Sequence, residues 1–447
     1  MPLTLSLATA LCCAACSCAL HAGEPSAHLE EVSTAVSVDQ LQATITKLVG
    51  FGTRHTLSDT TSDSRGIGAA RRWVQSRFVA VSKECGGCLQ VVMPSQTVTG
   101  AHVPRPTEVV DVVAIQRGSS EPNRVIVITG HLDSRVTDLM NAASDAPGAN
   151  DDASGVAALM EAARVLSKYK FRATLVYAAL SGEEQGLYGG KILAEYARQQ
   201  GWQVQANLNN DIIGNSHGES GVHDNSTVRV FSEGTKALET PAQANRRRYN
   251  GGELDSPSRN IARYIAALSE KHLIDLRVQM VYRSDRYGRG GDQVAFLEAG
   301  FPAVRITEAR EDYTRQHQDL RVENGVRYGD TIDGVDFVYL AQVTRLNAIT
   351  LASMANAPMP PKGVAIEGAV TPHTTVKWQA VPGAARYRVW WRSTTDPQWR
   401  HHREVAGEVT QLVLKNVVID DWFFGVSALS AEGYESPVVF PGDAGSF

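Results

Sequence analysis

The sequence offers little that would tie the protein to a membrane or to nucleic acid. Its 43 Lys and Arg residues are outnumbered by 48 Asp and Glu residues, which gives a formal net charge of −5. A chain without a basic excess or a basic patch is not drawn electrostatically to nucleic acid or to an anionic membrane surface. Beyond the N-terminus, no apolar run approaches the roughly 18 residues that a transmembrane helix needs. The 43% hydrophobic content is that of a soluble globular protein, long enough for two or three domains.

Cysteine is scarce, and four of the six cysteines lie in the apolar N-terminal segment. Residues 1–22 end in small residues before a polar stretch, which favours a secretory signal peptide cleaved near Ala22, although no Lys or Arg precedes the apolar part. A buried N-terminal helix or strand is the main alternative, and a lipid anchor on Cys16 or Cys18 is a minor one. The signal peptide predicts a secreted or periplasmic protein.

The mature chain keeps only Cys85 and Cys88, in the sequence ECGGCL. In an oxidising compartment this spacing favours a local disulfide bond. In the cytosol it would suggest redox activity or half of a zinc site, but the mature chain has no second CxxC pair.

Apolar strands alternate with amphipathic helices through most of the chain. Residues 38–82 are predicted to be helical, because apolar side chains recur there every three to four residues. Strands are predicted at 109–116, 124–130, 172–180, 204–213, 226–231 and 302–306, and further helices at 153–169, 191–200, 257–272 and 333–355. This alternation predicts an α/β domain with a mixed, mostly parallel sheet that helices cover on both faces.

The pattern changes at residues 356–363, where the sequence NAPMPPKG predicts a linker between residues 23–355 and residues 364–447. The second segment contains short alternating strands separated by turns, which predict a small all-β sandwich. Its Trp378, its Tyr387 and the later stretch FFGVSALSAEGYES resemble a fibronectin type III module.

Histidines and carboxylates stand at the ends of the predicted strands or in the loops that follow them. They are His131 and Asp133, Asp151 and Asp152, Glu183 and Glu184, Asp211, and His317. Because the carboxyl ends of parallel strands meet at one edge of a sheet, we expect these side chains to converge. Each has an ordinary explanation when taken alone, since Asp152, for example, would serve as a helix N-cap. Together they form a mixed imidazole and carboxylate set that suits zinc, and their number suits two ions.

The adjacent pair Glu183 and Glu184 comes directly after the apolar run ATLVYAAL. Two neighbouring carboxylates repel each other and lose solvation near a core unless a cation compensates them. A metal bound by Glu184 would compensate that carboxylate and leave Glu183 free to act as a base.

This ordered set of residues resembles the secreted co-catalytic di-zinc aminopeptidases of metallopeptidase family 28, which include bacterial leucyl aminopeptidases. The similarity extends over residues 40–355. The resemblance implies the zinc aminopeptidase fold, two zinc ions per chain, and peptide or protein substrates with free N-termini. The implied reaction is hydrolysis of the N-terminal peptide bond by a zinc-activated bridging water, with Glu183 as the general base.

The resemblance implies a ligand set for each zinc ion. His131, Asp151 and Asp211 would hold one ion. Asp151, Glu184 and His317 would hold the other, so that Asp151 bridges the two.

Further roles follow from the same resemblance. Asp133 and Asp152 would support the ligands, with Asp133 orienting His131. A cis peptide bond is expected between Asp151 and Asp152.

Two positions match the family less closely. The sequence YGRGGDQ places Tyr287 and Asp292 where a tyrosine of the family helps to stabilise the reacting carbonyl oxygen, although Tyr287 as an ordinary loop residue remains open. His317 stands in HQD, a shorter spacing than relatives show, which leaves the role of Asp319 open.

Three alternatives remain. Dinuclear zinc carboxypeptidases and deacylases use similar motifs but insert a lid domain before the final histidine, whereas residues 212–316 are predicted to continue the sheet and helices. Glutaminyl cyclases share the fold and bind a single zinc. A catalytically inactive, peptidase-like binding protein would have lost ligands, and no ligand of the set is missing from this sequence.

Overall fold

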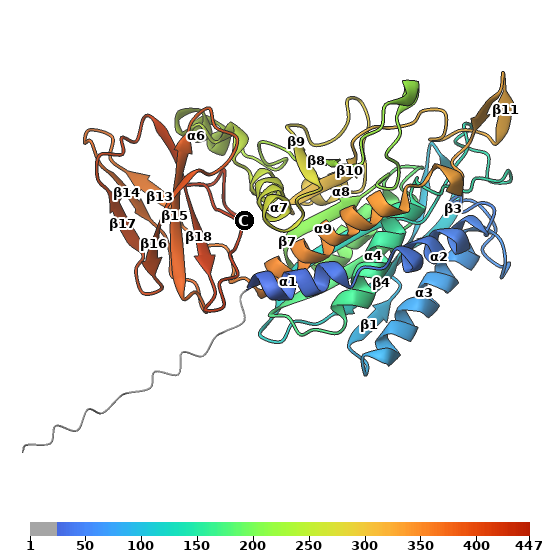
Figure 1. Cartoon of the computed structure of the whole chain (residues 1–447), viewed down its shortest axis with the longest axis horizontal. Helices are drawn as coiled ribbons and strands as arrows, with labels where there is room; N and C mark the ends of the chain where they lie inside the picture. The colour runs from blue at the N-terminus through green and yellow to red at the C-terminus, as the bar shows by residue number, and fades with distance from the viewer. Residues whose placement is uncertain (1–24) are drawn as a thin grey trace, which may run out of the picture.

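The computed structural model describes residues 25–447, so the predicted signal peptide at 1–22 lies outside the described residues. A large mixed sheet with helices on both faces forms one part of the molecule, and small antiparallel sheets form the other (Figure 1). Within the described part, no helix combines the length and the apolar character needed to cross a membrane.

The large sheet has eight strands in the order β1-β4-β6-β5-β7-β10-β8-β9. Their bounds are β1 (Leu89–Val92), β4 (Val112–Gln116), β5 (Glu121–His131), β6 (Ala173–Leu180), β7 (Gln203–Asn210), β8 (Thr227–Phe231), β9 (Arg277–Val281) and β10 (Ala303–Glu308). The four central strands β6, β5, β7 and β10 are parallel neighbours, whereas β4 pairs antiparallel with β6, and β8 antiparallel with β10. The carboxyl ends of the four central strands therefore meet at one edge, as the sequence predicts.

Helices cover both faces because successive strand residues point to opposite sides. Ile126 and Ile128 of β5 pack into one core, and the neighbouring Val125 and Val127 pack into another. The first core contains residues of α1 (Pro25–Thr34), α2 (Val38–Val49), α3 (Gly66–Glu84), α4 (Ala153–Leu166), α7 (Pro257–His272) and α9 (Phe337–Asn356), and the second contains residues of α5 (Tyr188–Gln199) and α8 (Gln293–Glu298).

Some element boundaries differ from the prediction. The helical pattern of 38–82 is divided into α2 and α3 by a loop, and the predicted strand at 109–116 is divided at Asp111. Val109 and Val110 belong instead to a hairpin of β2 (Ser95–Gly100) and β3 (Val103–Val110). The division has a physical cause, because the fully buried carboxylate of Asp111 accepts the backbone N–H of Ser181 from the loop after β6.

The C-terminal segment forms two three-stranded antiparallel sheets. They consist of β13 (Ala365–Glu367), β14 (Thr374–Lys377) and β17 (Gln411–Leu414), and of β15 (Arg386–Ser393), β16 (His401–Ala406) and β18 (Trp422–Leu429). Trp378 and Tyr387 lie in their shared core with ring centroids 5.3 Å apart. The likeness to fibronectin type III modules stays a prediction.

The C-terminal segment packs against α7 of the large domain (Figure 1). Asp255, just before α7, is fully buried and pairs with Arg263 at 2.7 Å and with Arg392 of β15 at 2.6 Å. The indole of Trp399 donates to Asn260 of α7 at 3.1 Å and lies over the guanidinium of Arg392. The contact therefore contains a buried carboxylate shared by an arginine of α7 and an arginine of the C-terminal sheets.

Asp255→Ala should lower the free energy of unfolding by about 3–5 kcal/mol, because it leaves two buried guanidinium groups without their anion. Denaturant unfolding followed by tryptophan fluorescence measures this loss. The matched control is Asp443→Ala, which removes the exposed ion pair with Arg246 on α6 (Pro241–Asn250) and should cost less than about 1 kcal/mol. Equal losses in the two variants would contradict the assignment.

Candidate metal centre

The predicted site residues meet at the carboxyl edge of the central strands. His131 is the last residue of β5, the pair Glu183 and Glu184 follows β6, and Asp211 follows β7. Asp151 precedes α4, and His317 lies in the loop after β10. Segments far apart in the sequence are thus brought together by the strand order.

Asp151 lies between two imidazoles. Its Oδ1 is 3.0 Å from Nε2 of His131, and its Oδ2 is 2.8 Å from Nε2 of His317. Nε2 of His317 is also 3.0 Å from Oε1 of Glu184. Ligand atoms of His131, Asp151 and Glu184 all lie within 4.8 Å of one another. The four side chains therefore form a compact cluster of nitrogen and oxygen donors.

The carboxylates of this cluster stabilise positive charge on the neighbouring imidazoles. Burial lowers the pKa of His317, but the charges of Glu184 and Asp151 outweigh it and raise that pKa to about 10. The pKa of His131 is likewise raised, because Asp151 and Glu183 outweigh burial. Oε1 of Glu184 is buried, and its close polar neighbour is Nε2 of His317 at 3.0 Å. A cation bound by imidazole nitrogen and carboxylate oxygen, such as zinc, fits these donors.

Asp211 stands at the same edge in a different pairing. Its Oδ2 is 2.7 Å from Nη1 of Arg305, a fully buried residue of the neighbouring strand β10. Burial, together with the charges of Glu184 and Asp211, raises the pKa of Glu183 well above its usual value. The structure thus places Asp211 within electrostatic reach of the cluster, beside an arginine that sequence reasoning did not anticipate.

Asp133 aligns the two adjacent glutamates. Its carboxylate accepts the backbone N–H groups of Glu183 at 3.2 Å and Glu184 at 3.1 Å, and the hydroxyl of Thr56 at 3.2 Å. Nδ1 of His131 lies 3.0 Å from the carbonyl oxygen of Asp133 and 3.7 Å from its carboxylate. Asp133 therefore contacts His131 chiefly through its backbone, while its side chain fixes the turn that carries both glutamates.

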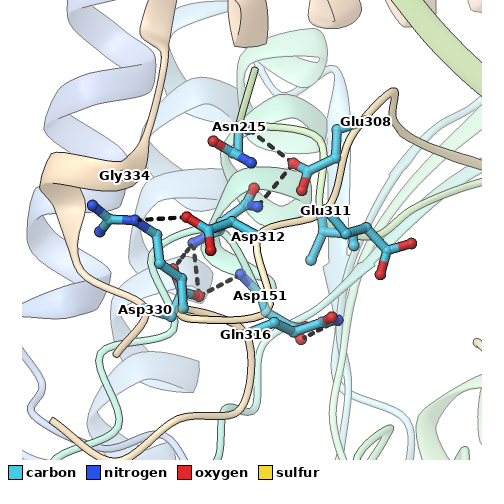
Figure 2. A pocket seen from close by; sticks show the side chains of 11 residues that line it. Asp151, Asn215, Glu308, Glu311, Asp312, Gln316, Asp330 and Gly334 are labelled. Carbon is cyan, nitrogen blue, oxygen red and sulfur yellow. Dashed lines mark hydrogen bonds and ion pairs between the residues drawn. The ribbon is translucent and has the colours of Figure 1, made fainter. Parts of the chain in front are cut away.

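Two buried acids hold the loop that carries Asp151. Asp152 is the N-cap of α4, and it accepts the backbone N–H groups of Gly155 and His131, both at 2.9 Å. Asp330 accepts the backbone N–H of Asp151 at 2.7 Å (Figure 2), and burial raises the pKa of Asp330 to about 7. The peptide bond between Asp151 and Asp152 is cis.

Arg54 and Arg135 complete the surroundings of the cluster. Arg54 is almost fully buried, and its guanidinium donates to the carbonyl oxygens of Leu132 and Gly148, which joins the loops of His131 and Asp151. Arg135 lies 3.0 Å from Oε2 of Glu184 and 2.6 Å from Nδ1 of His317. No local pattern distinguishes these two arginines, or Asp330, in the sequence, because their partners come from distant segments.

Tyr287 is not among the residues that the structure brings together. Its side chain is 88% exposed and lies beside Arg283. Its neighbour Arg286 is largely buried and contacts Glu311 at 3.3 Å. Asp292 is buried and accepts the backbone N–H of Gly190 at 3.1 Å.

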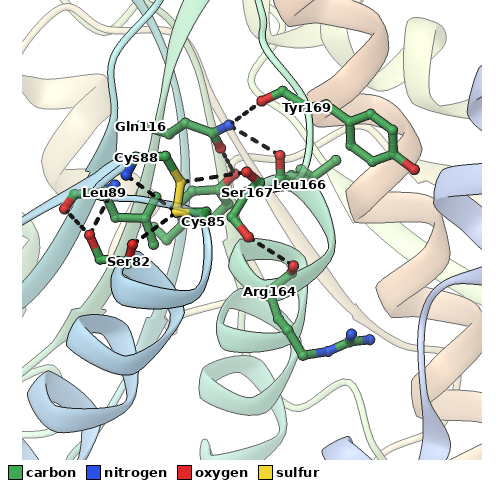
Figure 3. The surroundings of a disulfide bond; sticks show 10 residues. Ser82, Cys85, Cys88, Leu89, Gln116, Arg164, Leu166, Ser167 and Tyr169 are labelled. Carbon is green, nitrogen blue, oxygen red and sulfur yellow. Dashed lines mark hydrogen bonds between the residues drawn. A yellow bond between two sulfur atoms is a disulfide. The ribbon is translucent and has the colours of Figure 1, made fainter.

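A disulfide bond joins Cys85 and Cys88 at the turn between α3 and β1 (Figure 3). The hydroxyl of Ser82 donates to the carbonyl oxygen of Leu89 across the same turn, at 2.7 Å. The disulfide thus reinforces the connection between a helix and the edge strand, far in sequence from the cluster.

A family model and curated relatives both match this chain over much of its length. A family model described as "Peptidase family M28" matches residues 111–333. A protein of Pyrenophora tritici-repentis with the description "Probable zinc metalloprotease" is 44% identical over 423 residues, which cover 93% of this chain and 87% of the relative. A Leptosphaeria maculans protein of similar description is also 44% identical, over 93% of this chain and 97% of its own.

Solved structures share the fold at lower identity. The LapA aminopeptidase of Legionella pneumophila has a TM-score of 0.54 at 20% identity and covers 74% of this chain and 75% of its own. An aminopeptidase from Aneurinibacillus sp. strain AM-1 has a TM-score of 0.51 at 14% identity, over 73% of this chain and 96% of its own. At these identities the likeness establishes the shared fold alone.

Proposed function

The chain belongs to peptidase family M28 and is a zinc metalloprotease, and from this premise we propose that it is an aminopeptidase with two zinc ions. The observation that carries the proposal is the position of Asp151, with one carboxylate oxygen near each of two imidazoles. A carboxylate in this position suits a bridging ligand between two ions. The aminopeptidases among the solved structures of this fold support the same reaction class.

The proposed ligands are His131, Asp151 and Asp211 for one ion, and Asp151, Glu184 and His317 for the other. Asp211 would exchange its ion pair with Arg305 for a metal contact, or keep both through its two oxygens. Zinc bound by these residues would lower the pKa of a water and polarise the scissile carbonyl.

Glu183 is the proposed general base. It takes a proton from the attacking water and gives it to the leaving amine. The two N–H groups held by Asp133 fix the backbone of the turn, so that Glu184 faces His317 and Glu183 remains outside these contacts. A raised pKa suits a group that must first accept and then donate a proton.

The segment between Asp211 and His317 argues against the carboxypeptidase and deacylase alternative. Strands β8, β9 and β10 from this segment all join the large sheet, so the described residues contain no separate lid domain there. We further propose secretion or export to the periplasm, which the disulfide between Cys85 and Cys88 supports.

The test is hydrolysis of aminoacyl anilides by the purified protein, with its metal content measured in parallel. We expect cleavage of leucyl p-nitroanilide, no cleavage of its N-acetylated form, and about two zinc ions per chain. A chelator should remove the activity, and added zinc should restore it. Preferential hydrolysis of the acylated substrate would identify a deacylase, and a single zinc per chain would contradict the bridging role of Asp151.

A further inference from the structure

A cavity of about 500 Å³ lies near the turn that carries Glu183, and three arginines line it. It is lined by the loop before α3, by the first turns of α3, and by β3. Arg71, Arg72 and Arg105 contribute to its wall, whereas Glu108 is its only carboxylate. We call it the arginine pocket.

Arg71 is a buried cation that forms no close ion pair within residues 25–447. It is 5% exposed, and its Nε donates to the hydroxyl of Ser181 at 3.2 Å. Its Nη2 has no hydrogen-bond partner among residues 25–447, and the carboxylates whose charge reaches the guanidinium are Asp111, Asp133 and Glu108. A buried, unpaired N–H of a charged group is costly, so an acceptor that reached Arg71 from the pocket would be favourable.

Arg105 supplies a second free guanidinium. It lies on β3, is exposed, and forms no ion pair within the described part of the chain. Arg72 differs, because it already contacts the carbonyl oxygen of Thr60 at 2.8 Å and the carboxylate of Asp63 at 3.4 Å. Two of the three arginines are therefore available to an anion.

The pocket adjoins the proposed catalytic machinery on one side. Thr56, which lines it, donates to the carboxylate of Asp133, and that carboxylate holds the backbone of Glu183. In the sheet, β4 lies on one side of β6, and β5 and β7 lie on the other. The arginine pocket, next to Ser181 and the β2–β3 hairpin, is thus on the side of Glu183 opposite to Asp211.

We propose that the arginine pocket binds an oxyanion, a carboxylate or a phosphate group, between Arg71 and Arg105. Resting on the function proposed above, we assign the carboxylate terminus of a short peptide substrate as the source. Glu183 donates its proton to the leaving amine. The substrate residues after the scissile bond therefore lie on the side of the metal centre where Glu183 stands. A free inorganic anion would have the same chemistry and is distinguished by experiment.

The first experiment titrates the intact enzyme with inorganic phosphate in a calorimeter. Wild-type protein should bind phosphate, Arg105→Met should bind it at least fivefold more weakly, and Arg71→Met should lose this binding. Arg77→Met, an exposed arginine further along α3, is the matched control and should bind as wild type does. Because Arg105 is exposed, its variant tests the pocket even if Arg71→Met fails to fold.

If phosphate binds at the metal centre instead, wild type and Arg105→Met will bind it with equal affinity, and this result would overturn the proposal. Absence of binding to the wild type would overturn it as well. This measurement needs no peptidase activity, so its result is independent of whether the aminopeptidase proposal holds.

The second experiment identifies the source of the anion. A tripeptide such as Leu-Gly-Gly should be hydrolysed with a kcat/KM at least tenfold above that of its C-terminal amide. In Arg105→Met this ratio should fall towards one, mainly because the KM for the tripeptide with the free carboxylate rises. Phosphate binding combined with a ratio near one in wild type would overturn the peptide assignment and identify a free inorganic anion as the occupant.

Discussion

Glu183→Gln should lower kcat about 10²–10⁴-fold, which is the contribution expected of a general base, while the zinc content stays unchanged. Gln keeps the size and shape of Glu but cannot accept the proton of the attacking water. The backbone N–H of residue 183 would still be held by Asp133, so the turn and the neighbouring Glu184 should keep their positions. Steady-state hydrolysis of leucyl p-nitroanilide and elemental analysis of the same preparation measure the two quantities.

Glu184→Gln is the matched control for this substitution. It makes the same chemical change one residue along, but on the carboxylate whose Oε1 lies 3.0 Å from Nε2 of His317 and whose Oε2 lies 3.0 Å from Nε of Arg135. We expect this variant to lose zinc as well as activity. If Glu183→Gln retained activity within tenfold of wild type, or lost zinc as Glu184→Gln does, the division of roles between the two glutamates would be refuted.

The sequence carried much of the information about the candidate metal centre, because its residues lie at strand ends or in the loops that follow strands. The apolar runs before His131 and Glu183 identify buried strands, and parallel neighbours bring their carboxyl ends together. The strand order is not encoded locally, yet any order that keeps these strands adjacent brings the same residues to one edge. This explains why the cluster of His131, Asp151, Glu184 and His317 follows from the pattern alone.

The residues that escaped sequence analysis act through long-range contacts. Arg54 links two loops about 80 and 90 positions away, and Asp330 holds Asp151 from a loop near the end of the domain. Neither has a periodic pattern or a motif around it. The sequence also does not show which way a loop side chain points. In the loop of Tyr287, Arg286 is largely buried and the tyrosine is exposed. The division of a predicted strand at Asp111 likewise depends on a partner, Ser181, in another loop.

Asp151→Asn should remove most of the bound zinc and reduce hydrolysis to background. In the proposed centre both ions share this carboxylate, so the substitution removes negative charge from both at once. An amide retains one weak oxygen donor and presents an N–H group to the other imidazole. We expect the zinc bound after dialysis against a mild chelator to fall at least tenfold, with helix content by circular dichroism unchanged.

Asp330→Asn separates loss of the bridge from loss of loop geometry. Asp330 accepts the backbone N–H groups of Asn150 and Asp151, and Asn at this position keeps one acceptor oxygen for them. Residues that position ligands typically contribute 10–100-fold to metal affinity, so this variant should bind zinc more weakly but recover activity when zinc is added. Asp151→Asn should not recover at any zinc concentration. One oxygen of Asp151 lies near each imidazole. If Asp151→Asn recovered activity when zinc is added, the two imidazoles would belong to two separate mononuclear sites and not to one bridged pair.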